Sequence, residues 1–146
     1  MATYSSSAYT NKAPFAAHGI AGNVKVARAS VSCTAAPSTS DTLNFFYLPK
    51  NARVHLAVLE ATDMDTNGSP TLTLNVGDSG SASRLFSAST VGQAGTLSSA
   101  IATAGQGYKT TAKTLITGTA QANAATGAAG TVSLTVFYVV EESATS

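Results

Sequence analysis

Alternation of apolar and polar residues, the pattern typical of β-strands, recurs along the chain from residue 23 onward. It is clearest in TLTLNV, where Leu72, Leu74 and Val76 share one face and polar residues share the other. Turn-forming residues separate the strand-like segments, and no convincing helical period interrupts them. The expected strands are residues 23–33, 43–49, 52–62, 71–76, 83–89, 108–122 and 131–142. The pattern predicts an all-β chain that folds as a single β-sandwich, jelly-roll-like domain.

The first expected strand changes phase along its length. Val24 and Val26 share one face, but the apolar positions from Ala29 to Cys33 are one residue out of step with them. A β-bulge near Arg28 would account for the shift, because a bulge inserts one extra residue into a strand. The sequence therefore predicts a bulge at this point.

Three other segments lead to specific expectations. Residues 52–62 are apolar on both faces, which predicts a central strand that is covered on both sides. Residues 108–122 are rich in threonine, and we expect a strand, or a pair of strands, at an outer position. Residues 90–107 have glycines near both ends and predict a long loop with one weak helical turn.

Cys33, the one cysteine, is expected to be a small buried apolar residue in a strand.

The first 22 residues differ from the rest of the chain. They are small and polar, without a strand or helix period, and single aromatic residues stand at Tyr4, Tyr9 and Phe15. We expect an extended N-terminal arm over residues 1–22, followed by the sandwich domain over 23–146. Two interpretations remain open: an arm that becomes ordered on a neighbouring molecule, with the three aromatic residues at the interface, or a frayed terminus.

Composition narrows the class of function. The chain has 146 residues, 10% of them charged, and a net charge of +1. A soluble protein usually has about a quarter charged residues, so the low share favours a surface that packs against other copies or partners over a secreted Ser/Thr-rich module. The sequence has no cluster of basic residues of the kind that binds nucleic acid. It also has no apolar run close to the ~20 residues that span a membrane. The first residues contain no recognisable signal peptide.

Residues 63–68 match the start of a calcium-binding EF-hand loop. Asp63, Asp65, Asn67 and Gly68 occupy the required positions, but the twelfth position is Leu74 in place of the bidentate glutamate. The alternative is an ordinary turn, because Asn-Gly tolerates positive φ. We favour the turn and keep the three oxygen-bearing residues as candidate metal ligands.

The segment GDSG, residues 77–80, resembles the nucleophile segment of chymotrypsin-like proteases. His55 and Asp63 precede Ser79 in the order of that family. The chain is too short for the two barrels that assemble such a triad, and no G-x-S-x-G elbow is present. We therefore expect no catalytic site, no enzyme activity and no cofactor. The spacing of Asp78 and Arg84 instead predicts a short ion pair across the next loop.

Taken together, residues 46–86 resemble a pattern of virion structural proteins of tailed bacteriophages. The pattern combines LP-x-x-A-x-V, the hairpin D-x-D-x-N-G-x-P-x-L-x-L-x-V-G-D, and an arginine followed by an aromatic residue. The closing segment GAAGTVSLTVFYVV extends the resemblance to residue 140. The matching residues are Leu48, Pro49, Ala52, Val54, Asp63, Asp65, Asn67, Gly68, Pro70, Leu72, Leu74, Val76, Gly77, Asp78, Arg84 and Phe86.

This resemblance implies a decoration, or cement, protein that binds and stabilises an assembled capsid. It implies a homotrimer on the outer surface of the virion, with the shell of the major capsid protein as its partner and no nucleic acid or membrane. A neck or tail structural component is an alternative. The rival from another class is a carbohydrate- or surface-binding β-sandwich module, with calcium in the 63–68 turn. Such modules usually display tryptophan, which this chain lacks.

Overall fold

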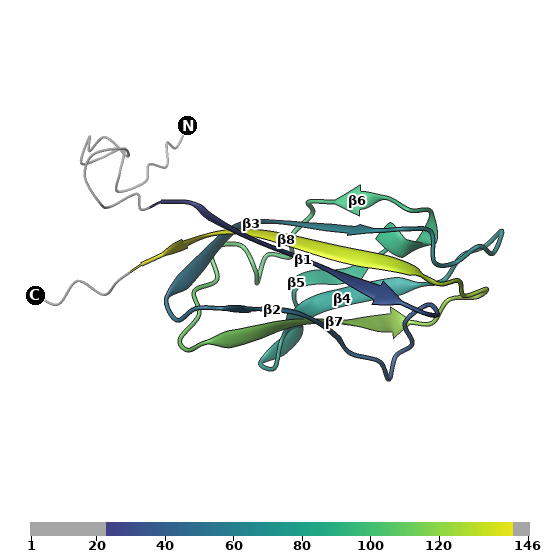
Figure 1. Cartoon of the computed structure of the whole chain (residues 1–146), viewed down its shortest axis with the longest axis horizontal. Coiled ribbons are helices and arrows are strands. Elements are labelled where there is room, and N and C mark those ends of the chain that lie inside the picture. The colour runs from purple at the N-terminus through teal and green to yellow at the C-terminus, as the bar shows by residue number, and fades with distance from the viewer. Residues whose placement is uncertain (1–22, 142–146) are drawn as a thin grey trace, which may run out of the picture.

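The computed structural model describes residues 23–141, which form a sandwich of two antiparallel sheets (Figure 1). A single 3₁₀ turn, η1, lies between the fifth and sixth strands of this part of the chain. The elements are β1 (Lys25–Cys33), β2 (Leu43–Leu48), β3 (Ala52–Ala61), β4 (Thr73–Asp78), β5 (Ser81–Ser89), η1 (Val91–Gln93), β6 (Leu97–Ser98), β7 (Thr114–Ala122) and β8 (Gly130–Val140). The expectation of an all-β sandwich is confirmed.

The strand order is that of a jelly roll. One sheet has the order β1-β8-β3-β6 and the other β2-β7-β4-β5. The pairs β1–β8, β2–β7, β3–β6 and β4–β5 are those of one long antiparallel hairpin folded at the β4–β5 turn. The added pairs β3–β8 and β4–β7 roll this hairpin into two layers. Both ends of the described chain therefore lie at the same end of the sandwich (Figure 1).

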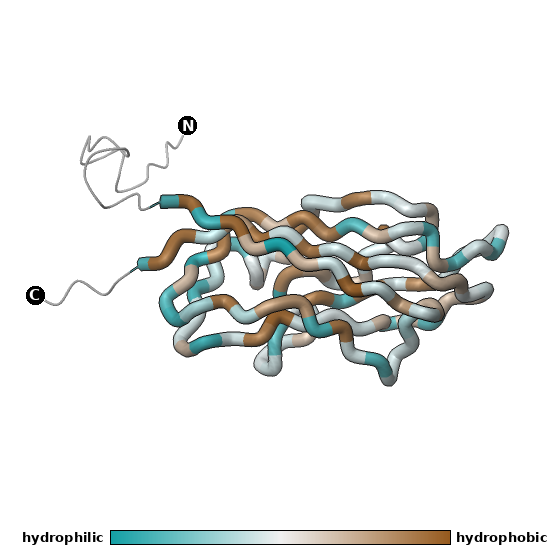
Figure 2. The backbone as a smooth tube through the Cα atoms, viewed as in Figure 1, coloured by the Kyte–Doolittle hydropathy of each residue, from teal (hydrophilic) through white to brown (hydrophobic). Residues whose placement is uncertain are grey.

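The core lies between the two sheets and is made by alternate residues of each strand, as the alternating hydropathy along the tube indicates (Figure 2). Phe86 is the largest buried side chain, and most of the others are Leu or Val. The small residues Ala52 and Ala57 are also fully buried in this core. The largest fully buried side chains are Phe86, Leu48, Leu59, Met64, Leu72, Leu74, Leu85, Ile116, Leu134, Val54, Val76 and Val132.

The bulge predicted in β1 is wrong. β1 pairs with β8 residue by residue from Lys25 to Cys33, without a shift of register. The phase change has another cause: Ala27, Val31 and Cys33 pack against the core, whereas Val26 faces outward and is 57% exposed. The sequence pattern showed two faces with apolar residues but not which face was inside.

β3 contains the irregularity that β1 lacks. Its register against β8 shifts between Val54 and Leu56, at His55. Val54 points into the core on one side of the shift and Ala57 on the other, so Leu56 is turned outward and is 40% exposed. β3 is an interior strand of its sheet, as expected, but it is covered on one face only.

Two further expectations are corrected. β7 lies between β2 and β4, so the threonine-rich segment is not at an outer position. Its threonines mark the solvent face of the sheet, while Ile116 and Ala120 are buried in the core. Residues 90–107 hold, besides the expected helical turn, the short strand β6, which pairs with Leu59 and Glu60.

Within residues 23–141, no helix is long and apolar enough to cross a membrane.

Candidate functional site

Asp65 is a buried structural hub, with 1% of its surface exposed. Its carboxylate accepts four hydrogen bonds from backbone N–H groups, two in its own loop and two in the β7–β8 turn. The donors are Thr71 at 2.7 Å, Leu72 at 3.0 Å, Ala125 at 3.0 Å and Thr126 at 2.9 Å. The side chain therefore ties two loops together that are about sixty residues apart in the sequence.

These contacts determine the charge of Asp65. Burial by itself raises the pKa of a carboxyl group, but the N–H donors of Thr126, Ala125, Thr71 and Leu72 outweigh burial and hold the pKa of Asp65 well below its ordinary range. The residue is thus a carboxylate whose two oxygens are already engaged by the backbone.

The neighbouring candidate ligands are engaged in the same way. Asp63 Oδ1 accepts from the N–H of Asp65 at 3.2 Å, and Asn67 Oδ1 accepts from the N–H of Ser69 at 2.9 Å. In the part of the chain that the structure describes, no group of three His, Cys, Asp or Glu side chains is placed to hold a metal ion. The geometry supports the turn interpretation, but Gly68 does not adopt positive φ, which among the described glycines occurs at Gly95 and Gly107.

The GDSG segment forms the tight turn between β4 and β5. Asp78 Oδ1 accepts from the N–H groups of Gly80 at 2.9 Å and Ser81 at 3.0 Å. A Cβ atom at Gly77 would lie 2.0 Å from the carbonyl oxygen of Ser81, so only glycine fits there. The motif that resembles a protease signature is explained by this close backbone approach.

Asp78, Arg84 and Tyr108 form a second polar cluster. Arg84 Nε donates to Asp78 Oδ2 at 2.7 Å, which confirms the predicted ion pair, and its guanidinium lies 4.1 Å from the centroid of the Tyr108 ring. Burial acts to raise the pKa of Asp78, but the Arg84 guanidinium and the Ser81 N–H more than offset it, and the pKa is lowered. Burial and the charge of Asp78 raise the pKa of Tyr108.

This cluster borders an open cavity of about 510 Å³. Ser79 and Lys113 also line it, and the ammonium of Lys113 lies 4.6 Å from the centroid of the Tyr47 ring. Asp78 and Arg84 thus bind each other, and Lys113 lies against an aromatic ring.

The protease-like residues are not brought together. β4 runs from the Asp65 hub at its beginning to the turn that holds Ser79, so Asp63 and Ser79 lie at opposite ends of the sandwich. His55 lies at the register shift of β3, where it is exposed. None of the three is positioned to act on another.

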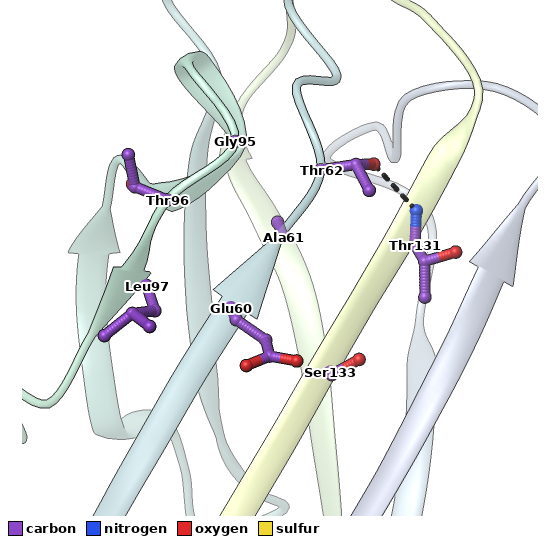
Figure 3. Close-up of a pocket in the computed structure, with 8 residues that line it drawn as sticks. All are labelled: Glu60, Ala61, Thr62, Gly95, Thr96, Leu97, Thr131 and Ser133. Carbon is purple, nitrogen blue, oxygen red and sulfur yellow. Dashed lines mark hydrogen bonds between the residues drawn. The ribbon is translucent and has the colours of Figure 1, made fainter.

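A larger cavity, of about 570 Å³, lies on the outer face of the β1-β8-β3-β6 sheet (Figure 3). It is bordered by the exposed Leu97 of β6 and by Glu60 and Ser133. Glu60 is held by an ion pair with Arg28, and the Thr62 hydroxyl oxygen accepts from the N–H of Thr131 at 3.0 Å. The Ser133 hydroxyl lies 2.6 Å from that of Ser30, so several polar groups of the lining bind one another.

The same outer face carries a row of apolar side chains that the sequence reasoning missed. Val26, Phe137 and Leu56 are direct neighbours across β1, β8 and β3. Val24, two residues before Val26, is 63% exposed. We call these four residues the outer apolar row. The signal for it was the out-of-phase pair Val24 and Val26, which was assigned to a bulge.

The predicted interface residues Tyr4, Tyr9 and Phe15 lie outside the described residues, so their role stays a prediction.

Comparison with known proteins gives matches among solved structures. No protein-family model and no curated protein matches the sequence. A chain in the capsid asymmetric unit of cyanophage Pam1 is 47% identical, with a TM-score of 0.76, and the match covers 96% of this chain and 99% of that one. A chain in the capsid of Ralstonia phage GP4 is 36% identical, with a TM-score of 0.73, covering 84% and 87%.

A more distant match shares the fold alone. A chain in the acid-stable capsid of Helicobacter pylori bacteriophage KHP30 is 15% identical, with a TM-score of 0.59 over 81% of this chain and 89% of that one. The sandwich is thus kept in capsid structures whose sequences have diverged widely.

Proposed function

Because this chain belongs to the family of phage capsid structural proteins that contains the Pam1 and GP4 chains, we propose that it is a decoration protein, which binds the outside of an assembled capsid and stabilises it. The observation that carries the proposal is the match to a capsid chain at 47% identity over almost the full length of both chains. The match supports a virion structural protein, and the decoration role is the part that we propose.

The surface supports this role. A decoration protein adds many weak contacts to a shell, and symmetry multiplies each contact. The outer face of the β2-β7-β4-β5 sheet carries Thr117 and Thr119 of β7, beside Tyr47 of β2, which is 57% exposed. With a net charge of +1 and 10% charged residues, such a surface approaches another protein with little electrostatic cost.

The hydrogen bonding of the buried polar groups also supports the decoration role. No buried side-chain nitrogen or oxygen atom of residues 23–141 lacks a hydrogen-bond partner. The two carboxylates that resembled functional motifs, Asp65 and Asp78, act as ties between loops. A subunit that resists mechanical stress on a shell benefits from loops fixed in this way. The same contacts weigh against a calcium-assisted carbohydrate module.

The proposed assembly is a homotrimer on the shell of the major capsid protein. Residues 1–22, with Tyr4, Tyr9 and Phe15, extend the reach of each subunit onto adjacent subunits. Aromatic side chains suit this task because each adds a large apolar contact area with few rotatable bonds.

The test is binding to shells. Purified full-length protein is mixed with capsids that lack it, and the particles are sedimented and their composition measured. We expect co-sedimentation with a fixed number of copies per particle, and particles that release their contents at a higher temperature. Protein that stays in the supernatant, or that is found in virions with the neck or tail fraction only, would refute the decoration role.

A further inference from the structure

The outer apolar row is a surface that the sandwich does not use for its own stability. Val26 is 57% exposed and Leu56 is 40% exposed, although both stand in strands whose inward residues build the core. Phe137, between them on β8, is half-buried. Single exposed apolar residues are ordinary, but neighbours on three adjacent strands make a contiguous patch.

The row is confined to one end of its face. The next pairs along β1 and β8 are polar: Arg28 donates to the Thr135 hydroxyl at 2.8 Å, and the hydroxyls of Ser30 and Ser133 are 2.6 Å apart. The apolar end is the one at which the described chain begins and ends, where β1 and β8 carry apolar positions (Figure 2). Covering the row removes apolar surface from water, which is favourable.

Residues 1–22 join the sandwich at this place. They lead directly into Asn23 and Val24, and Val24 is itself part of the row. They contain Tyr4, Tyr9 and Phe15, with Lys12 as their one lysine and no Arg, Asp or Glu. Twenty-two residues reach at most about 75 Å when extended, whereas a four-stranded sheet is roughly 15–20 Å wide.

From these observations we propose that the outer apolar row of each subunit binds residues 1–22 of a second copy of the chain. The inference rests on the proposed function, because it requires several copies side by side. β1 starts on the row and runs away from residues 1–22. To cover its own row the segment would have to turn back over the start of β1, whereas it can reach the row of an adjacent copy while it continues away from its own sandwich.

The first experiment detects contact between two different chains. Both carry Cys33→Ser, so that the native thiol is absent. One carries Phe15→Cys, and the other carries Leu56→Cys and a size tag. The full-length chains are co-expressed, purified together and treated with a short bismaleimide. We expect a covalent heterodimer on a denaturing gel, at least fivefold more abundant than in a matched control in which Thr117→Cys, on the opposite outer face, replaces Leu56→Cys.

Two outcomes would overturn the proposal. The first is a heterodimer yield no greater than that of the Thr117→Cys control. The second is a crosslink that forms only within one chain when Phe15→Cys and Leu56→Cys are placed together, because it would show that each subunit covers its own row.

A second variant tests the row without a crosslinker. Val26→Thr with Leu56→Thr keeps strand-compatible, exposed side chains but removes the apolar contact. We expect the fold to be unchanged by circular dichroism, and the heterodimer yield between Phe15→Cys and a Ser30→Cys reporter, which is exposed on the same face, to fall at least fivefold. An unchanged yield would count against the row as the binding surface.

Shell binding separates this inference from the proposed function. If the crosslink fails but the wild-type protein still co-sediments with capsids, the exchange of residues 1–22 is wrong and the decoration role stands. If the crosslink forms and no capsid binding occurs, the exchange stands and the decoration role is wrong.

Discussion

Asp78 and Arg84 form a two-point ion pair, with Arg84 Nε 2.7 Å from Asp78 Oδ2 and Arg84 Nη2 3.2 Å from Asp78 Oδ1. The Asp78 side chain is 3% exposed, so its charge depends on this partner. The same guanidinium lies against the ring of Tyr108, in the loop that precedes β7. One side chain thus fixes the β4–β5 turn against a distant segment.

Replacement of Arg84 by lysine tests this pair. Lysine keeps the charge but cannot supply the planar fork or the stacking surface. We expect Arg84→Lys to lower the free energy of unfolding by about 2 kcal/mol, because a buried carboxylate loses part of its hydrogen bonding. The measurement is urea denaturation followed by circular dichroism.

Arg28→Lys is the matched control, because its ion pair with Glu60 is exposed on both sides. We expect a change below about 1 kcal/mol there. Equal effects of the two substitutions would show that burial of Asp78 is not what gives its pair importance.

Acid should destabilise the protein through carboxylates that accept hydrogen bonds in the folded state. The pKa values of Asp65, Asp78 and Glu141 are all lowered in the folded state, that of Glu141 chiefly by its bond with Arg53. A lowered pKa contributes stability that is complete above the ordinary carboxyl pKa, near 4, and is lost as the pH falls toward the folded-state value. We expect the urea midpoint to be insensitive to these groups from pH 5 to 7 and to decrease steadily below about pH 4.

Asp65→Asn should remove part of this acid dependence. The amide has one acceptor oxygen in place of two, so the variant should be less stable at pH 7 and its stability should decrease less between pH 4 and 2. Asp63→Asn, which alters a single local hydrogen bond, is the control. An unchanged slope for Asp65→Asn would assign the acid dependence to the other carboxylates.

Calcium gives a separate check on this loop. The oxygens of Asp65 are engaged by backbone N–H groups, so we expect the melting temperature of the wild-type protein to be the same with calcium and with a chelator. A calcium-dependent increase that disappears in Asp65→Asn would restore the loop as a metal site.

Two glycines provide a matched pair of substitutions. A Cβ at Gly77 would lie 2.0 Å from a backbone oxygen, whereas a Cβ at Gly68 would meet nothing within 4 Å. We expect Gly77→Ala to destabilise the fold by about 3 kcal/mol. Gly68 lacks positive φ, so Gly68→Ala should be neutral or stabilise by about 0.5 kcal/mol. The measurement is thermal unfolding of both variants. A Gly77→Ala variant as stable as the wild type would contradict the close approach of residue 77 to the Ser81 backbone.

Cys33 should react slowly. Burial, followed by the negative charge of Asp41, raises the pKa of its thiol, and the thiolate is the reactive form. We expect alkylation by iodoacetamide at pH 7 to be slower than that of a free cysteine in an unfolded peptide. A faster reaction would mean that this end of β1 opens readily.

The sequence was most informative where a pattern reports local structure. The alternation in 71–76 predicted β4, and the spacing of Asp78 and Arg84 predicted their ion pair, because both depend on neighbours within a hairpin. The role of Asp65 was invisible, since two of its donors lie in the β7–β8 turn. The strand β6 escaped notice because Leu97–Ser98 is too short to alternate.

The outer apolar row shows a different limit. A period of two residues says that Val24 and Val26 share a face, but the two faces of a strand are equivalent until its neighbours are known. The change of apolar phase after Val26 therefore predicts a bulge in β1, whereas the register shift of this sheet occurs in β3, at His55.

The nested strand order also affects how the subunit is made. β8, between β1 and β3, joins two strands that are synthesised long before it. The β1-β8-β3-β6 sheet therefore cannot be completed until β8 has been synthesised, and β1 has no strand partner before then. Folding must follow synthesis, through pairings of large sequence separation that are slow to form.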